Sequence, residues 1–106
     1  MIINIKYSNL ESTPALETYI NEKIGALDKF LSRWETDGDL NVFVEVGRIT
    51  QHHHKGPVYK AEVNLQLPGK LVRVERENWD VRVAVDEVKN VLGEILSQHN
   101  QKNNPR

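Results

Sequence analysis

The sequence predicts an α+β fold of two layers, in which two helices pack on one face of a four-stranded mixed sheet. Four short segments alternate apolar and polar residues, as strands with one buried face do. Two longer segments repeat apolar residues at the helical period, so each helix has one apolar stripe to bury. The predicted order β-α-β-β-β-α buries these surfaces most simply when both helices cover the same side of the sheet.

The first half of the chain predicts a strand, a helix and a second strand. Residues 2–7 alternate in polarity and predict the first strand. Thr13 suits the N-cap of a helix and Pro14 its first position, which predicts a helix over about residues 14–33. The apolar stripe of this helix comprises Leu16, Ile20, Ile24, Leu27, Leu31 and Trp34. Residues 40–50 alternate again, and a helix between two strands predicts a parallel pair with a right-handed crossover.

Two further strands are predicted to form an antiparallel hairpin. Residues 59–67 alternate strictly, with Lys60, Glu62, Asn64 and Gln66 on the polar side. The sequence Pro68-Gly69-Lys70 predicts a short turn, because proline and glycine favour turn conformations. Val72 and Val74 then face inward on the fourth strand, which completes an antiparallel meander.

The last helix is predicted to begin after Asp80, a residue that suits the N-cap. Its apolar stripe comprises Val81, Ala84, Val85, Val88, Val91, Leu92, Ile95 and Leu96. Its valines and Gly93 have weak helical propensity, so packing must hold this helix in place. We expect a single domain over residues 1–97 and a polar, frayed tail over residues 98–106.

The composition excludes several classes of protein. The absence of cysteine rules out a disulfide framework, a thiolate zinc site and thiol catalysis, and it favours a reducing cytoplasm. No apolar run approaches the roughly 20 residues needed to span a bilayer, and the N-terminus lacks the features of a signal peptide. The sequence contains neither a phosphate-cradling glycine loop nor a serine nucleophile motif, so we do not expect an enzyme.

The charges are segregated along the chain, although the net charge is only −1. Residues 1–47 carry four Lys/Arg and eight Asp/Glu, a balance of −4. Residues 48–76 carry six Lys/Arg and two Asp/Glu, a balance of +4, and also three histidines. Because a local field steers an anionic partner more than the net charge does, the middle of the chain is a candidate surface for phosphates. A solvated charged face is the alternative.

Three consecutive histidines, His52, His53 and His54, precede Lys55 in a predicted loop. Neutral imidazoles are good metal ligands, but adjacent residues of an extended loop point in alternating directions and rarely chelate one ion. We favour contacts of these side chains with phosphates or base edges. A metal site and a plain solvent-exposed loop are the alternatives.

The predicted first helix carries its charges on two flanks. Lys29 and Arg33 are four residues apart and therefore neighbours, with Lys23 on the same side. Glu17 and Asp28 lie on the opposite flank. Such segregation suits a surface that lies against phosphates, and a solubilised helix face is the alternative.

Two runs of the sequence resemble the ribosome hibernation promoting factor family, which includes protein Y and the sigma-54 modulation proteins. They extend from Val46 to Gly56 and from Tyr59 to Lys70, and the resemblance covers about residues 1–96. It implies a stress factor that binds ribosomal RNA of the small subunit in the channel for messenger and transfer RNA. Such a factor blocks translation by occupancy, without chemistry, and needs no cofactor, small-molecule substrate or membrane. We expect the isolated protein to be monomeric.

The resemblance and the charge pattern together predict a set of RNA-binding residues. These are Lys23, Lys29, Arg33, His52, His53, His54, Lys55, Lys60, Lys70, Arg73, Arg82 and Lys89. The family's second helix is usually basic in its last half, whereas this chain has Val91, Glu94 and Gln98 there. A protein-interaction or regulatory module with weakened RNA binding is therefore the alternative. Long members carry a further domain that pairs ribosomes, so this chain resembles a short form.

Overall fold

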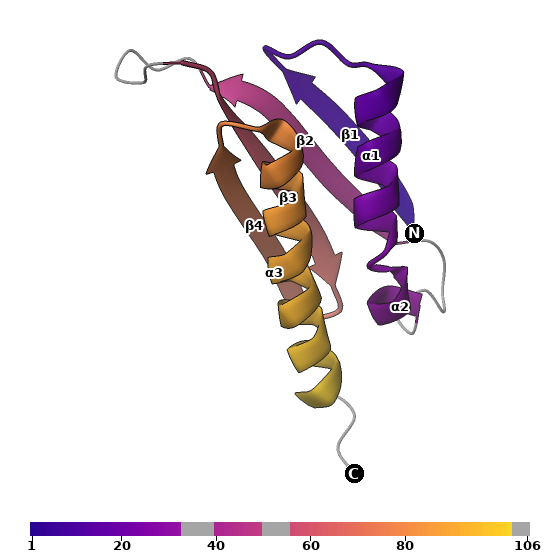
Figure 1. Ribbon diagram of the computed structural model, residues 1–106. Helices are drawn as coiled ribbons and strands as arrows, with labels where there is room; N and C mark the ends of the chain where they lie inside the picture. The colour runs from indigo at the N-terminus through magenta and orange to yellow at the C-terminus, as the bar shows by residue number, and fades with distance from the viewer. Residues whose placement is uncertain (33–39, 50–55, 103–106) are drawn as a thin grey trace.

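The computed structural model describes residues 1–32, 40–49 and 56–102 and confirms the predicted two-layer α+β fold (Figure 1). In chain order the elements are β1 (Ile2–Ser8), α1 (Pro14–Gly25), α2 (Asp28–Leu31), β2 (Asn41–Ile49), β3 (Val58–Leu67), β4 (Lys70–Asn78) and α3 (Val81–Lys102). The helices lie on one face of the sheet, and the opposite face is open. No helix within these residues is long and apolar enough to cross a membrane.

The sheet has the strand order β1-β2-β3-β4. The pair β1 and β2 is parallel, and the two following pairs are antiparallel, so the predicted pairing is confirmed. The turn between β3 and β4 is as short as expected: Leu67 pairs with Lys70, and Gly69 has a positive φ of 74°. Such a φ at the third position of a turn is the conformation that favours glycine.

The core lies between the sheet and the helices. The inward rows of all four strands meet there, for example Ile5, Val44, Val63 and Val74, which pair across the sheet. The two predicted helical stripes are buried against them, with Leu16, Ile20, Ile24, Leu27 and Leu31 from the first and Ala84, Val85, Val88, Leu92 and Leu96 from the last. Trp34, which was predicted to continue the first stripe, lies outside the described residues.

Both predicted helix caps are present. The Thr13 hydroxyl accepts a hydrogen bond from the Leu16 N–H at 3.1 Å, and an Asp80 carboxylate oxygen accepts one from the Arg82 N–H at 2.9 Å. Each bond satisfies an amide that lacks a partner within its helix.

The continuous helix predicted over residues 14–33 is wrong, because α1 ends at Gly25. The Leu27 N–H donates to the Ile24 carbonyl at 3.0 Å, so the backbone tightens to a three-residue spacing before α2 begins at Asp28. Glycine costs about 1 kcal/mol relative to alanine within a helix, which weakens this point. Leu27 stays buried across the break, so the stripe survives although the helix does not.

The last helix is longer than predicted. We expected residues 98–106 to be frayed, but α3 continues to Lys102. The Asn100 side chain donates to the backbone carbonyl of Phe30 at 3.0 Å, which ties the end of α3 to α2. The end of α3 is polar in sequence but is still held by a specific contact with Phe30 of α2.

Candidate nucleic-acid interface

Within the part of the chain that the structure describes, the predicted RNA-binding residues lie at several separate places. Seven of the twelve lie in the described part of the chain: Lys23, Lys29, Lys60, Lys70, Arg73, Arg82 and Lys89. The other five, Arg33, His52, His53, His54 and Lys55, lie outside it. The described residues separate into a group on the helix side of the sheet, a group on the open face, and isolated positions.

On the helix side, two predicted residues share one aromatic ring. The Lys23 ammonium of α1 lies 5.4 Å from the centroid of the Tyr19 ring, and the Arg82 guanidinium of α3 also lies 5.4 Å from it. Cations within about 6 Å of an aromatic ring are attracted by its electron-rich face. Tyr19 thus brings together two positive charges from helices far apart in the sequence.

Asp86 joins this group from α3. The Tyr19 hydroxyl donates to an Asp86 carboxylate oxygen at 2.7 Å, and the Lys23 ammonium lies 3.7 Å from the same oxygen. This hydrogen bond, together with burial and the negative charge of Asp86, raises the pKa of Tyr19 above its usual value, although Arg82 opposes the shift. We call Tyr19, Lys23, Arg82 and Asp86 the interhelical cluster; with two cations and one carboxylate its formal charge is +1.

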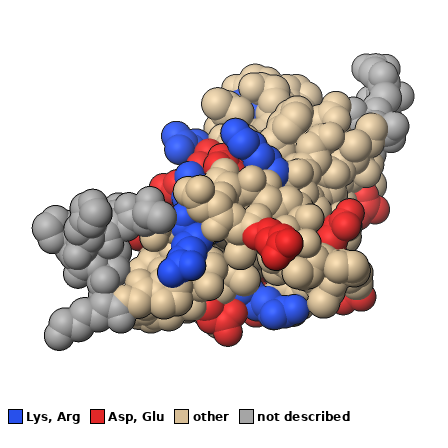
Figure 2. All heavy atoms as spheres, turned by 90° about the horizontal axis from the view of Figure 1, so that it is seen from above, with Lys and Arg blue, Asp and Glu red and all other residues tan. Residues whose placement is uncertain are grey.

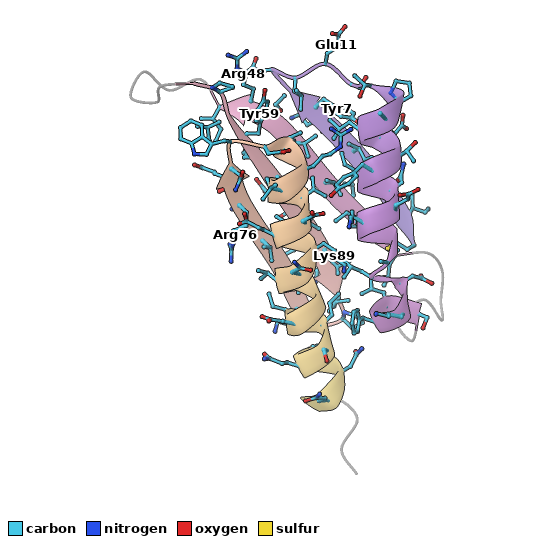
Figure 3. The ribbon with its side chains drawn as sticks, viewed as in Figure 1. Tyr7, Glu11, Arg48, Tyr59, Arg76 and Lys89 are labelled. Atoms are coloured by element: carbon cyan, nitrogen blue, oxygen red, sulfur yellow. The ribbon has the colours of Figure 1, made fainter. Side chains whose placement is uncertain are left out.

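Three predicted residues belong neither to the interhelical cluster nor to the group on the open face. Lys29 is exposed on α2, with its ammonium 5.2 Å from the centroid of the Phe30 ring. Lys89 is half-buried on α3 (Figure 3). Lys70 is exposed at the turn that opens β4, at the opposite end of that strand from Asn78.

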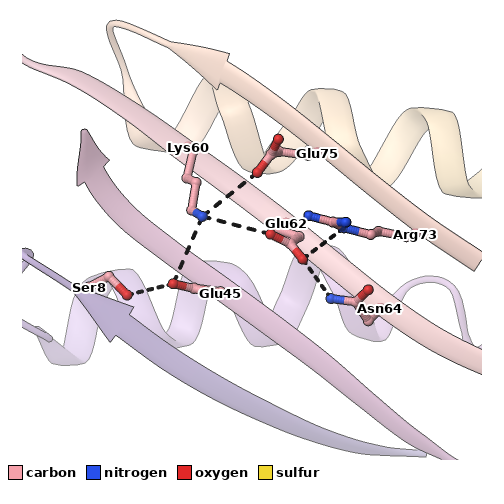
Figure 4. A network of polar contacts seen from close by, with 7 residues as sticks. All are labelled: Ser8, Glu45, Lys60, Glu62, Asn64, Arg73 and Glu75. Carbon is pink, nitrogen blue, oxygen red and sulfur yellow. Dashed lines mark hydrogen bonds and ion pairs between the residues drawn. The ribbon is translucent and has the colours of Figure 1, made fainter. Parts of the chain in front are cut away.

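On the open face, Lys60 and Arg73 lie against carboxylates (Figure 4). The Lys60 ammonium is 3.7 Å from carboxylate oxygens of Glu62 and Glu75 and 4.0 Å from one of Glu45. The Arg73 Nε donates to Glu62 at 3.0 Å. Both predicted cations therefore already have anionic partners within the chain, unlike a bare basic patch.

Glu62 is the centre of this network and is 8% exposed. The hydrogen bond from Asn64 lowers the pKa of Glu62, and Arg73 and Lys60 lower it further, while burial acts in the opposite direction. Glu62 is therefore a carboxylate at neutral pH. The network includes Ser8, whose hydroxyl donates to Glu45 at 2.6 Å, so it crosses all four strands.

The predicted set omitted two exposed arginines near the end of the sheet where β2 and β4 terminate on the helix side. Arg48 pairs with Tyr59, and Arg76 pairs with Ala61, and both arginines are exposed (Figure 3). The alternation along each strand could have predicted their side of the sheet, because Arg48 and Arg76 continue the inward rows of valines past the edge of the core. Figure 2 shows this end of the molecule from above, where most of the visible Lys and Arg side chains lie on the left, with acidic ones beside them and on the right.

A metal site finds no support in the described residues. No three His, Cys, Asp or Glu side chains among them are grouped so that they could hold a metal ion. The alternative of a metal bound by His52, His53 and His54 concerns residues outside this part of the chain.

Comparisons with known proteins confirm the resemblance indicated by the sequence. A family model described as "Sigma 54 modulation protein / S30EA ribosomal protein" matches residues 3–104. The "Ribosome hibernation promotion factor" of Bacillus subtilis (strain 168) is 30% identical over 104 residues, which are 98% of this chain and 51% of the relative. The "Ribosome hibernation promoting factor" of Klebsiella oxytoca is 26% identical over 102 residues, which are 96% of both proteins.

The fold also matches a solved structure, the Thermus thermophilus Protein Y N-terminal domain. The TM-score is 0.72 at 30% sequence identity, over 93% of this chain and 99% of that domain. The chain thus spans about half the length of the Bacillus relative and nearly all of the Thermus domain.

Proposed function

Because the chain belongs to the Sigma 54 modulation protein / S30EA ribosomal protein family, we propose that it associates with the ribosome and inhibits translation. In this proposal the chain acts in the cytoplasm as a monomer, binds ribosomal RNA of the small subunit and blocks the subunit by occupancy, without catalysis or a cofactor. The observation that carries the proposal is the match over residues 3–104, which includes all the described helices and strands except the first residue of β1, Ile2. Relatives named as ribosome hibernation factors support it.

We assign the contacts with RNA to the helix side and the adjoining sheet end. These surfaces carry the cations Lys23 and Arg82 over Tyr19, together with the exposed Arg48 and Arg76. On the open face, Lys60 would have to leave its carboxylates before it could approach a phosphate. Phosphate contacts supply most of the affinity for RNA. The helix side is the better candidate because Lys23 and Arg82 share a single carboxylate, Asp86, and their cluster keeps a formal charge of +1.

Co-sedimentation with purified small ribosomal subunits over a series of salt concentrations tests the proposal. We expect the chain to pellet with the subunits at low salt and to dissociate as salt rises, because neutralised phosphates release counterions. In parallel, addition of the chain should slow protein synthesis in a reconstituted translation system. A chain that remains in the supernatant at low salt would overturn the proposal.

A second candidate is a protein-interaction or regulatory module with weakened RNA binding. The acceptors Glu45, Glu62 and Glu75 on the open face favour it, because an acidic surface repels phosphates. Under this alternative, the chain would bind a protein partner but would not bind RNA-containing small subunits in the same sedimentation series.

A further inference from the structure

Exposed apolar side chains gather on the open face of the sheet. Ile2, Phe43 and Leu71 are 45%, 55% and 63% exposed, and they are three of the five large hydrophobic residues exposed within the described chain. Ile2 pairs with Asn41 and Leu71 with Gln66, so both lie toward the same end of the face as Phe43. Ile2 and Phe43 lie on the neighbouring strands β1 and β2, whereas Leu71 lies on the opposite edge strand, β4. The exposed apolar surface around Phe43 is therefore a candidate site of interaction.

The same face is hollowed beside Phe43. A depression of about 200 Å³ lies between β1 and β2, and its polar lining comes from Asn4, Lys6, Glu45 and Asn64. A cavity of about 150 Å³ is enough to hold a benzene ring. The depression therefore has room for one aliphatic or aromatic side chain from a partner.

Polar side chains around the depression have already used hydrogen-bond donors within the chain. The Asn4 amide donates to Asn41 at 3.2 Å, and the Asn64 amide donates to Glu62 at 2.8 Å. The Gln66 amide donates at 2.8 Å to the backbone carbonyl of the next residue. At least one hydrogen of each of these amide nitrogens is therefore engaged within the chain, whereas Glu75 and Glu77 are exposed acceptors on the same face.

The charges of the face point in the same direction. Four carboxylates and three cations lie on it, a formal charge of −1: Glu45, Glu62, Glu75 and Glu77 against Lys6, Lys60 and Arg73. Lys60 and Arg73 are engaged with these carboxylates, and Glu75 and Glu77 are exposed beside them. A phosphate chain would meet a net negative charge, whereas lysine or arginine side chains would find exposed carboxylate acceptors in Glu75 and Glu77.

We propose that the open sheet face binds an extended, lysine- or arginine-rich protein segment, with one apolar side chain of the segment in the depression beside Phe43. The basic groups of the segment lie toward Glu75 and Glu77. This surface is opposite the helix side to which the RNA contacts are assigned, so a segment bound here leaves the helix side open. The inference does not depend on which macromolecule occupies the helix side.

Fluorescence anisotropy with a labelled, lysine-rich peptide that contains one central leucine tests the inference. We expect saturable binding that weakens about tenfold in Phe43→Thr, the change typical of a central anchor. Threonine keeps the strand propensity of this position. The matched control is Val83→Thr, which alters an exposed apolar residue of α3 and should leave the affinity unchanged. The double variant Glu75→Gln with Glu77→Gln should weaken binding and flatten its salt dependence.

Two further measurements distinguish a basic segment with an apolar anchor from other ligands of this face. A peptide with serine in place of leucine should bind more weakly; equal binding would mean that charge alone attracts the segment, and would overturn the inference. Amide chemical shifts of the unmodified chain should change on the outward residues of β1 to β4 when the peptide is added, and changes confined to the helices would contradict it. The inference also fails if Phe43→Thr instead abolishes binding of a single-stranded RNA oligonucleotide or self-association of the chain.

Discussion

On the helix side of the sheet, Lys23 and Arg82 share the ring of Tyr19, whereas on the open face Lys60 lies among three carboxylates. Both groups combine cations with carboxylates, and the cations of both were predicted to bind RNA. Their surroundings differ because the helix side has one carboxylate for two cations and the open face has an excess of carboxylates. The number of carboxylates around a cation, rather than the identity of the cation, therefore decides how readily it meets a phosphate.

The largest expected effect comes from breaking the open-face network at its centre. Glu62→Gln removes a charged acceptor that binds Arg73 and Asn64 and lies near Lys60. Loss of hydrogen bonds to a buried charge should lower the free energy of unfolding by about 2 kcal/mol, measured by urea denaturation. The control is Glu77→Gln on the same face, where an exposed carboxylate should change stability by less than about 0.5 kcal/mol.

Acid should expose the same interaction without a change of sequence. The pKa of Glu62 is lowered on folding from its usual 4.5, so its contribution to stability is complete above that value. This contribution is lost as the pH falls from 4.5 through the lower pKa of the folded state. In Glu62→Gln, the loss of stability between neutral and acidic pH should be smaller than in the unmodified chain, as thermal unfolding across this range would reveal. If both proteins lost the same stability as the pH fell, Glu62 would not be the group responsible for the loss.

A matched pair of double variants tests whether the cations of the helix side or those of the open face bind the ribosome. Lys23→Gln with Arg82→Gln and Lys60→Gln with Arg73→Gln each remove two positive charges, but from opposite faces. The first should weaken binding to small subunits about tenfold and reduce the salt slope by about 2. The second should leave the affinity nearly unchanged, provided that circular dichroism shows both proteins folded. The reverse ranking would place the RNA on the open face.

The smallest effect is expected at Asp86, the carboxylate of the interhelical cluster. Asp86→Asn keeps an acceptor for the Tyr19 hydroxyl but removes a negative charge, so affinity for small subunits should rise by no more than about threefold. The pKa of Tyr19 should fall back toward 10.0, because its hydrogen bond to a charged carboxylate is the first cause of the shift. Ultraviolet titration of tyrosine, with Tyr19→Phe to assign the signal, measures this change; an unchanged titration would argue against the contact.

Most of the fold follows from local pattern. Alternation separates inward from outward residues on each strand, and the helical period identifies the buried stripes, because both depend only on neighbouring residues. The end of α1 at Gly25 could not be predicted in this way. The tightened turn keeps Leu27 on the same buried stripe, so the apolar pattern continues across the break. The extension of α3 could not be predicted from local pattern either, because the Asn100 contact to Phe30 joins residues that are 70 positions apart.

The division of the cations between two faces depends on strand register. Counting outward from the turn, where Leu67 pairs with Lys70, places Glu62 opposite Glu75, so this part was accessible from the sequence. The position of Glu45 opposite Glu62 was not, because the connection between β2 and β3 is longer than a tight turn and does not fix the register. The contact of Arg82 with Tyr19 is set by how α1 and α3 pack, which no local pattern encodes.

The parallel pairing of β1 with β2 has a consequence for the order in which the molecule is completed. β3 and β4 are joined by a two-residue turn and are able to pair as soon as they exist, whereas β1 must wait for a strand that begins at Asn41. Closing a loop of that length has a larger entropic cost than closing a hairpin. We therefore expect the amides of β1 to gain protection from hydrogen exchange last during refolding. The N-terminal strand would then be the last strand to join an otherwise assembled sheet.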